Sequence, residues 1–444
     1  MSFRRAIGQH LERLLMRHHT VTIAGPQRVG KSTLVRDEFP GYPSINLRSP
    51  HRVAQVRAWT PQIADDTSGS LIVDGARNSP QAWQIIKKKF DEGHSDGVLV
   101  LVENPPYPIS EPIPPYVEVD QDGPARAVLL SATLSEMGPV GTRMLDFHEL
   151  LFRGGYPACL SADSQVVQFY DALLNDWYRE LNREFIGDAF MDRFKQFFHL
   201  VARGAGTPLN CSLLGRRVGV SHPQIRRWVD LVLRYYLGHL LPADGDTRGR
   251  RTTNTPRLYL WDTGIMCRLL GITQSGEIAA HPARKALMQT WMVSEVRKAL
   301  LHDGFGGGVS FWLDVRGNHV PLLIRRGKYK LAVSWDFIEA PRWSPRLETW
   351  AHLTSGEGWQ YFRVFFEGKH AEREQDISWI RWYEVPSAIL RHLGPLRSNG
   401  TVDWAQRPGS FPPQWPGGAV HPPRRRPRYG DRKTGSGFDP EEEQ

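Results

Sequence analysis

Hydrophobic and polar positions in the first 150 residues follow the patterns of alternating strands and helices. The apolar residues from Ile7 onward have helical spacing, the β-rich run Thr20–Ala24 stops at Gly25, and Lys31–Glu38 has helical character. Four more short β-like runs are predicted, with a helix over 80–90 between the second and the third: 44–47, 71–74, 97–102 and 127–132. This alternation predicts an α/β fold with a largely parallel sheet covered by helices.

The next region, residues 151–272, has mainly helical spacing. Longer helices are predicted over 166–185 and 189–201, and two shorter ones over 213–218 and 224–237. Ser221 lies at the N-cap position of the second short helix, which makes the pair a helix-turn-helix pattern. The polar segment 244–251 and the β-rich run that follows it resemble the hairpin of a winged helix. We therefore expect a helical and winged-helix domain here.

The pattern becomes mixed again over residues 275–395. A helix is predicted over 283–301, followed by strands at 309–314, 320–324, 330–335 and 361–366. In the last 44 residues, 14 are Pro or Gly, and such a segment has too little apolar surface to fold alone. The sequence thus predicts domains at 1–150, 151–272 and 275–395, and a disordered Pro/Gly/Arg-rich tail at 396–444.

Length and composition narrow the class of protein. At 444 residues the chain is too long for one core, and its 40% hydrophobic content excludes global disorder. The three cysteines are too few and too far apart for a disulfide framework or a zinc-binding thiolate pair, as expected in a reducing compartment. No apolar run approaches the roughly 18 residues of a membrane span. We expect a cytoplasmic protein that does not bind a membrane.

The net charge of +9 adds a nucleic acid to the candidate partners. Arginine supplies 45 of the 56 basic residues, and its planar guanidinium suits phosphate recognition. A genomic base-composition bias explains the same excess equally well, so charge alone leaves the question open.

The strongest chemical motif follows the first predicted strand. Residues 25–32 read Gly-Pro-Gln-Arg-Val-Gly-Lys-Ser, which is the G-x-x-x-x-G-K-[ST] spacing of a phosphate-binding loop between a strand and a helix. Backbone N–H groups of such a loop surround phosphates, the lysine reaches the β- and γ-phosphates, and the Ser hydroxyl binds Mg²⁺. The predicted ATP-binding residues are Gly25, Arg28, Val29, Gly30, Lys31, Ser32 and Thr33, with Lys31 also assigned a catalytic role. A degenerate loop without nucleotide is the alternative.

A second set of candidates ends the later core strands. Asp74 closes the apolar strand 71–74 and is predicted to hold Mg²⁺ together with Ser32, although a strand-end Asp can also simply cap a turn. Gly75 follows it, where ATP-hydrolysing relatives usually have a Glu that orients the attacking water. Glu103 and Asn104 close the next strand and are candidates for a substitute base or phosphate sensor, or for a surface turn.

One glutamine and five arginines in the helix-turn-helix pattern are the candidates for contact with double-stranded DNA. They lie at the start of its second helix and on the predicted wing: Gln224, Arg226, Arg227, Arg248, Arg250 and Arg251. A protein contact or an intramolecular lever explains this module equally well.

Three motifs in this order resemble a prokaryotic AAA-type P-loop ATPase family: residues 25–33, the Gly-Gly-Tyr-Pro at 154–157 and the Leu-Tyr-Leu-Trp-Asp-Thr-Gly at 258–264. The likeness spans roughly residues 1–340. Members pair an ATPase domain and a winged helix with a C-terminal PD-(D/E)XK nuclease-like domain. The resemblance therefore implies a chain of three such domains and the use of ATP and Mg²⁺.

The chain departs from the family at its catalytic positions. Asp74-Gly75 stands where the family has Asp-Glu. In the third domain Gln289 replaces a Glu, 319–321 read His-Val-Pro in place of Glu-Val-Asp, and 332–334 read Ala-Val-Ser in place of Glu-x-Lys. A metal-dependent nuclease needs those carboxylates and the lysine. The comparison implies slow or absent ATP hydrolysis and a degenerate, inactive nuclease-like domain.

The sequence thus favours an ATP-binding switch that engages DNA or a protein partner, and AAA-type modules often assemble into homo-oligomers. The alternative is a DNA-binding or scaffold protein with a vestigial phosphate loop. An active Mg²⁺-dependent nuclease would need carboxylates that the sequence does not reveal.

Overall fold

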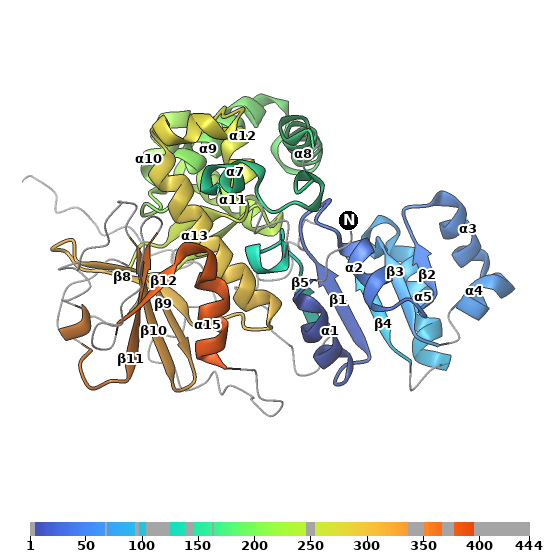
Figure 1. Ribbon diagram of the computed structural model, residues 1–444. Helices are drawn as coiled ribbons and strands as arrows, with labels where there is room; N and C mark the ends of the chain where they lie inside the picture. Colours follow the sequence, from blue (N-terminus) through green and yellow to red (C-terminus); the bar gives the residue numbers. More distant parts are fainter. Residues whose placement is uncertain are drawn as a thin grey trace, which may run out of the picture. The chain divides into compact units, whose positions relative to one another are not determined.

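The computed structural model (Figure 1) describes residues 5–66, 69–93, 97–103, 125–137, 146–161, 164–245, 254–335, 350–352, 354–365 and 377–394. Its N-terminal part contains a five-stranded sheet in the order β2-β3-β4-β1-β5, in which all neighbours are parallel. The strands are β1 (Thr20–Ala24), β2 (Ser44–Asn46), β3 (Leu71–Asp74), β4 (Leu99–Val102) and β5 (Ala125–Val128). The predicted parallel α/β sheet is confirmed.

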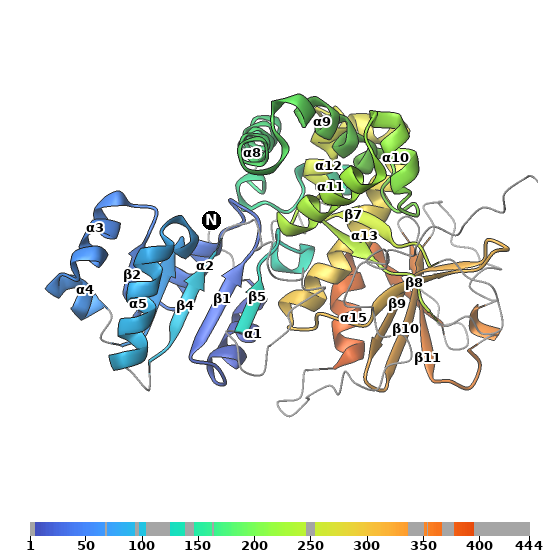
Figure 2. The same cartoon turned by 180° about the vertical axis from the view of Figure 1, so that it is seen from behind.

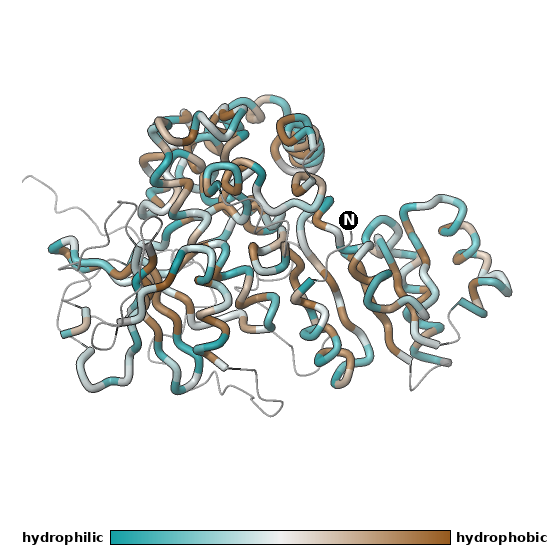
Figure 3. The backbone as a smooth tube through the Cα atoms, in the orientation of Figure 1, coloured by the Kyte–Doolittle hydropathy of each residue, from teal (hydrophilic) through white to brown (hydrophobic). Residues whose placement is uncertain are grey.

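Helices connect these strands and cover the sheet (Figures 1 and 2). They are α1 (Ile7–Leu15), α2 (Lys31–Glu38), α3 (Pro50–Ala58), α4 (Pro61–Asp66), η1 (Ala76–Asn78) and α5 (Pro80–Gly93). β3 and β4 are apolar along their whole length up to Asp74, and together with Ile45 and residues of α3 and α5 they form one hydrophobic core. The hydropathy colouring in Figure 3 shows these apolar strands between more polar helices. Parallel strands buried on both faces need such continuous apolar runs.

One predicted strand is displaced. The run 127–132 was expected as a strand, whereas β5 ends at Val128. The Leu129 N–H still donates to Ala24 O at 2.8 Å. From Leu130 onward the backbone bonds to groups outside the sheet: Leu130 O accepts from the Arg5 side chain, and Ala132 N–H donates to Gly155 O. Tertiary contacts have therefore replaced the ladder that the apolar pattern predicts.

The helical region confirms the two longer and the two shorter predicted helices. Its elements are α7 (Phe147–Arg153), η2 (Pro157–Cys159), α8 (Val166–Leu181), η3 (Asn182–Ile186), α9 (Asp188–Arg203), α10 (Cys211–Val218), α11 (His222–Arg234), β6 (Gly238–Leu241), β7 (Arg257–Leu260) and α12 (Thr263–Leu269). Ser221 caps α11 as predicted, accepting from Gln224 N–H at 3.3 Å. The expected extent 224–237 is wrong at its C-terminal end, because Tyr236 has a φ of 55° and the chain turns there into β6. β6 and β7 form an antiparallel pair.

The third region contains a second, mixed sheet in the order β12-β11-β10-β9-β8. Its elements are η4 (Ser275–Ala280), α13 (Arg284–His302), β8 (Val309–Leu313), β9 (His319–Arg326), β10 (Tyr329–Trp335), β11 (Trp359–Phe365), β12 (Ile377–Arg381), η5 (Trp382–Glu384) and α15 (Val385–Leu393). β8, β9 and β10 pair antiparallel, whereas β10, β11 and β12 pair parallel. A cluster that includes Trp312, Trp350 and Trp359 packs on one face.

The chain divides into two units, residues 1–403 and 404–444. The second unit lies outside the described residues, as does the predicted tail from 396 onward. The three domain boundaries within the first unit stay predictions. Among the described residues, no helix combines the length and apolarity that crossing a membrane requires.

Candidate nucleotide site

The loop between β1 and α2 has the backbone shape that phosphate binding requires. Gly25 has a φ of 147°, and a Cβ placed on it would lie 2.0 Å from Leu129 O. Gly30, with a φ of 99°, is the N-cap of α2. Only glycine adopts such angles without strain. The predicted strand, loop and helix are all present, and the loop leads directly into the N-terminus of α2, where an anion would be stabilised.

Lys31 is buried and bonded to its own loop. Its Nζ donates to Gly25 O at 2.9 Å and to Pro26 O at 2.6 Å. The pKa of Lys31 is lowered to about 7, chiefly by burial and then by the nearby Arg48 charge, while Asp74 acts in the opposite direction. An arriving phosphate would replace the two carbonyls as the partner of the ammonium group and favour its charged form.

Ser32 and Asp74 meet as the sequence predicts. The Ser32 hydroxyl donates to Asp74 Oδ2 at 2.7 Å, and Arg48 donates to the other oxygen, Oδ1, at 2.9 Å. The hydroxyl and the carboxylate are hard oxygen donors that suit Mg²⁺, which would neutralise phosphate charge there. Arg48 is the part of this site that the sequence did not reveal, because it lies 26 residues from its partner.

The end of β4 lies between the loop and Asp74, because β4 is the strand between β1 and β3. Glu103 follows β4, and its backbone N–H donates to Ile23 O at 3.0 Å. Its carboxylate is 3.6 Å from the Arg126 guanidinium of β5. Asn104 lies outside the described residues, so the role of this pair as base or sensor stays a prediction.

Two side chains of the loop contact α8, which the sequence did not predict. Gln27 donates to Glu180 at 2.8 Å, and Arg28, in a left-handed conformation with a φ of 61°, donates to Asp176. Asp176 and Glu180 lie one helical turn apart, so one face of α8 meets the loop. Val29 is fully buried, and Thr33 is exposed in the first turn of α2.

A buried arginine supports the loop from within the domain. Arg5 donates to Val29 O at 3.3 Å and to Leu130 O at 2.6 Å, and its Nε lies 3.1 Å from Glu136. His302 and Arg5 hold the pKa of Glu136 well below its ordinary value against the effect of burial. The loop is therefore fixed by an ion pair whose members are 131 residues apart.

The two other motifs that carry the family resemblance meet at Asp262. This carboxylate accepts from Gly155 N–H and from the Tyr170 hydroxyl, both at 2.8 Å. It also caps α12 through Gly264 and Ile265. A Cβ on Gly154 would lie 2.4 Å from Asp262 Oδ1, and Pro157 is the residue nearest to a Cβ on Gly30, at 3.8 Å. These motifs thus form one junction next to the phosphate loop.

The candidate DNA-binding residues separate into two groups. Gln224 and Arg226 are partly buried in the first two turns of α11, and Arg227 is exposed in the second turn. Arg216 and Arg217 on α10 are also exposed, and the sequence prediction missed them. The wing candidates Arg248, Arg250 and Arg251 lie outside the described residues.

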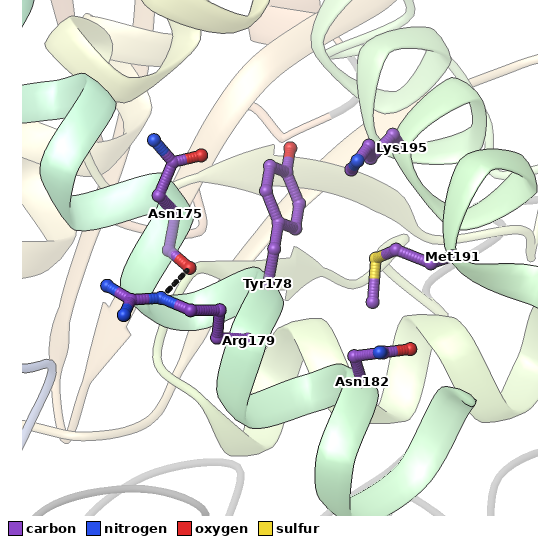
Figure 4. A pocket seen from close by; sticks show the side chains of 6 residues that line it. All are labelled: Asn175, Tyr178, Arg179, Asn182, Met191 and Lys195. Carbon is purple, nitrogen blue, oxygen red and sulfur yellow. Dashed lines mark hydrogen bonds between the residues drawn. The ribbon is translucent and has the colours of Figure 1, made fainter. Parts of the chain in front are cut away.

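A pocket of about 440 Å³ lies between α8 and α9 (Figure 4). It is lined by Asn175, Tyr178, Arg179, Asn182, Met191 and Lys195. The Tyr178 ring extends between the two helices, and the Lys195 ammonium lies 5.7 Å from its centre. No residue that the sequence singled out lines this pocket.

The positions expected to be nuclease remnants lie on the predicted elements. Gln289 is on α13, His319, Val320 and Pro321 begin β9, and residues 332–334 lie in β10. Among the residues described, no group of three or more His, Cys, Asp or Glu side chains is placed to hold a metal ion.

A parallel sheet with this loop after β1 and a carboxylate at the end of β3 is consistent with a P-loop ATPase-like domain. Comparison with known proteins adds relatives of unassigned function. A family model described as a domain of unknown function (DUF8612) matches residues 144–276. Uncharacterized proteins of Mycobacterium bovis and Mycobacterium tuberculosis are each 22% identical over 306 residues, 67% of this chain. The match spans 66% of the length of those relatives.

Two solved structures show distant similarity. The Walker-type ATPase of Pyrococcus abyssi is 13% identical with a TM-score of 0.39, over 59% of this chain and 94% of that one. A signal transduction ATPase with numerous domains from Pyrococcus horikoshii, which carries a tetratricopeptide repeat sensor, is 11% identical with a TM-score of 0.22, over 66% and 46% of the two chains.

Proposed function

We propose that this protein is an ATP-binding switch with slow or absent hydrolysis, in which occupancy of the phosphate loop is passed to the helical region. The observation that carries the proposal is the direct contact of the loop with α8. Gln27 and Arg28 lie inside the phosphate-binding motif and hold two carboxylates of α8. A ligand that reorganises this loop must therefore change the partners of that helix.

Slow turnover follows from the chemistry at β3. Ser32 donates to Asp74 at the end of β3, but Gly75 after it has no carboxylate with which to orient an attacking water. Glu103, which follows β4, lies 3.6 Å from the Arg126 guanidinium, so its carboxylate already has a charged partner. Binding without efficient hydrolysis is the behaviour of a switch rather than of a motor.

The binding step is tested by titrating a fluorescent ATP analogue into the wild-type protein and into Lys31→Ala. Removing the ammonium group should weaken binding by about 100-fold, because the variant has no charge-assisted hydrogen bond to phosphate at this position. Lys89→Ala is the matched control, since Lys89 is half-exposed on α5 and pairs only weakly with Glu92 at 3.3 Å. Equal affinity of Lys31→Ala and wild type would refute the proposal.

We further propose double-stranded DNA as the partner of the α10–α11 unit. The exposed Arg216, Arg217 and Arg227 place positive charge on two successive helices of a helix-turn-helix pattern. A protein partner, homo-oligomer formation and the inactive nuclease-like third domain stay proposals that rest on the sequence resemblance. In the rival function the phosphate loop is a relic and these basic surfaces alone bind DNA.

A further inference from the structure

Arg48 lies at the metal position of the candidate site because the chain places it there. β2 and β3 pair with Asn46 opposite Asp74, and Leu47 N–H donates to Asp74 O at 2.8 Å. The Asn46 side chain then accepts from Arg48 N–H at 2.9 Å and turns the chain back. The guanidinium thereby reaches Asp74 Oδ1 at 2.9 Å. Strand register and a local turn fix this contact.

Gly75 makes the space for this arrangement. A Cβ on Gly75 would lie 2.9 Å from Arg48 Cγ and 3.0 Å from Asn78 Oδ1, and its φ of 77° disfavours any other residue. A glutamate at position 75 would require the Arg48 side chain to shift from this position. The observed contact between Arg48 and Asp74 therefore goes with a glycine at position 75.

The charges at this point differ from those of an open metal site. Asp74 has both of its oxygens occupied, one by Ser32 and one by Arg48. The Asp74 side chain is 11% exposed, whereas that of Arg48 is 41% exposed. The Arg48 guanidinium can therefore either keep its contact with Asp74 or turn toward a phosphate, and it stays hydrated in both positions. An arriving divalent cation would have to displace a positive charge from its carboxylate ligand.

We infer that Arg48 takes over the role of the divalent cation at Asp74, so that the site binds the triphosphate of a nucleotide with little dependence on Mg²⁺. Its planar guanidinium can donate two parallel hydrogen bonds to phosphate oxygens, and with Lys31 it supplies two positive charges to the β- and γ-phosphates. This inference rests on the proposed nucleotide binding and goes beyond it by assigning the counter-charge. It also gives a reason for slow hydrolysis, since no metal positions the γ-phosphate.

The test measures the affinity of the full-length protein for a fluorescent ATP analogue, once with excess Mg²⁺ and once with EDTA. Wild type should change by less than about threefold between the two conditions, whereas Arg48→Ala should lose about tenfold or more in EDTA and recover with Mg²⁺. Arg52→Ala is the matched control, because Arg52 lies on the neighbouring α3 and pairs with Asp66 at 3.1 Å instead. It should behave as wild type does.

A second measurement follows Mn²⁺ binding to the nucleotide-free protein by electron paramagnetic resonance. Wild type and Arg48→Lys should bind Mn²⁺ weakly, since both keep a cation at Asp74, and Arg48→Ala should bind it about tenfold more tightly. Wild-type ATP binding that disappears in EDTA would overturn the inference and leave the proposed function intact. No ATP binding in either condition would overturn both.

Discussion

His239 is a buried histidine held neutral by its surroundings. Burial lowers its pKa to about 3, and its Nδ1 accepts from the Arg297 guanidinium. Its Nε2 lies 3.2 Å from the Ser294 hydroxyl, which itself donates to Leu260 O at 2.7 Å. Because an acceptor at Nδ1 has no proton, the ring carries its single proton on Nε2. Protonating the ring would place it beside Arg297 with no acceptor for the new N–H.

The stability of the protein should therefore fall in acid through His239. The unfolded chain gains a proton as the pH falls below about 6.5, whereas the folded ring resists protonation down to about 3, so stability is lost across this window. His239→Gln keeps a donor and an acceptor but does not titrate. Between pH 7 and pH 4 it should lose about 3 kcal/mol less stability than wild type in urea unfolding. His222→Gln, at an exposed site on α11, should follow wild type; identical pH profiles of His239→Gln and wild type would contradict the assignment.

The proximity of candidate site residues was predictable where one local motif places them. Lys31, Ser32 and Asp74 follow from loop spacing and from a carboxylate after an apolar strand, and the structure brings them together. Arg48 and Arg5 were not predictable, since arginine is the commonest charged residue here and their partners lie 26 and 131 residues away. Local spacing carries no signal for such pairings.

At the scale of elements, α8 connects the nucleotide site to the helical region. Its carboxylates Asp176 and Glu180 contact the phosphate loop, and its Tyr170 hydroxyl donates to Asp262 at 2.8 Å, next to α12. One helix therefore contacts both the loop and the junction of the family motifs. A movement of the loop can therefore be transmitted through α8 to the junction at Asp262.

Removing the two carboxylate charges of α8 that contact the loop should change nucleotide binding. Asp176→Asn combined with Glu180→Gln removes two negative charges near the triphosphate and releases Arg28, so ATP affinity should rise by about threefold to tenfold. ATP-induced changes in hydrogen exchange along α8 should disappear at the same time.

The control for this double variant is Asp171→Asn, which removes a charge from the same helix but from the pair with Arg268. Its ATP affinity should stay at the wild-type value. A double variant that binds ATP as wild type does, with the α8 exchange response intact, would show that the helix does not sense the loop.

Elements with long periodic patterns were predicted well, and those decided by tertiary contact were not. α13 was predicted to within one residue at each end, whereas β12 and α15 were missed. α15 contains Pro386, which commonly breaks a helix but is tolerated in its first turn. The early end of β5 depends on Arg5 and Gly155, which no window around β5 contains.

For the whole molecule, buried polar contacts join the segment after β5 to α13. Lys298 donates to Ala132 O at 3.1 Å, His302 Nε2 accepts from Leu130 N–H at 3.3 Å, and Glu295 accepts from Leu134 N–H. Glu295 and Lys298 also pair with each other at 3.1 Å and are almost fully buried. Separating these contacts would leave buried charges without a partner, which is costly. We therefore expect the segment after β5 and α13 to move together when a ligand binds.

If nucleotide occupancy controls DNA engagement, the full-length protein should bind a duplex with an affinity that ATP changes. We expect a shift of about fivefold or more in wild type and none in Lys31→Ala, measured by fluorescence anisotropy at several salt concentrations. Replacing Arg216, Arg217 and Arg227 by Ala should weaken binding and lower the salt slope by about one for each phosphate that these arginines neutralise. A triple variant with Arg57, Lys88 and Lys89 replaced by Ala, all exposed on α3 and α5, controls for the same loss of net charge. A steep salt dependence that ignores ATP in every variant would instead favour the rival function, in which the loop is a relic and basic surfaces alone bind DNA.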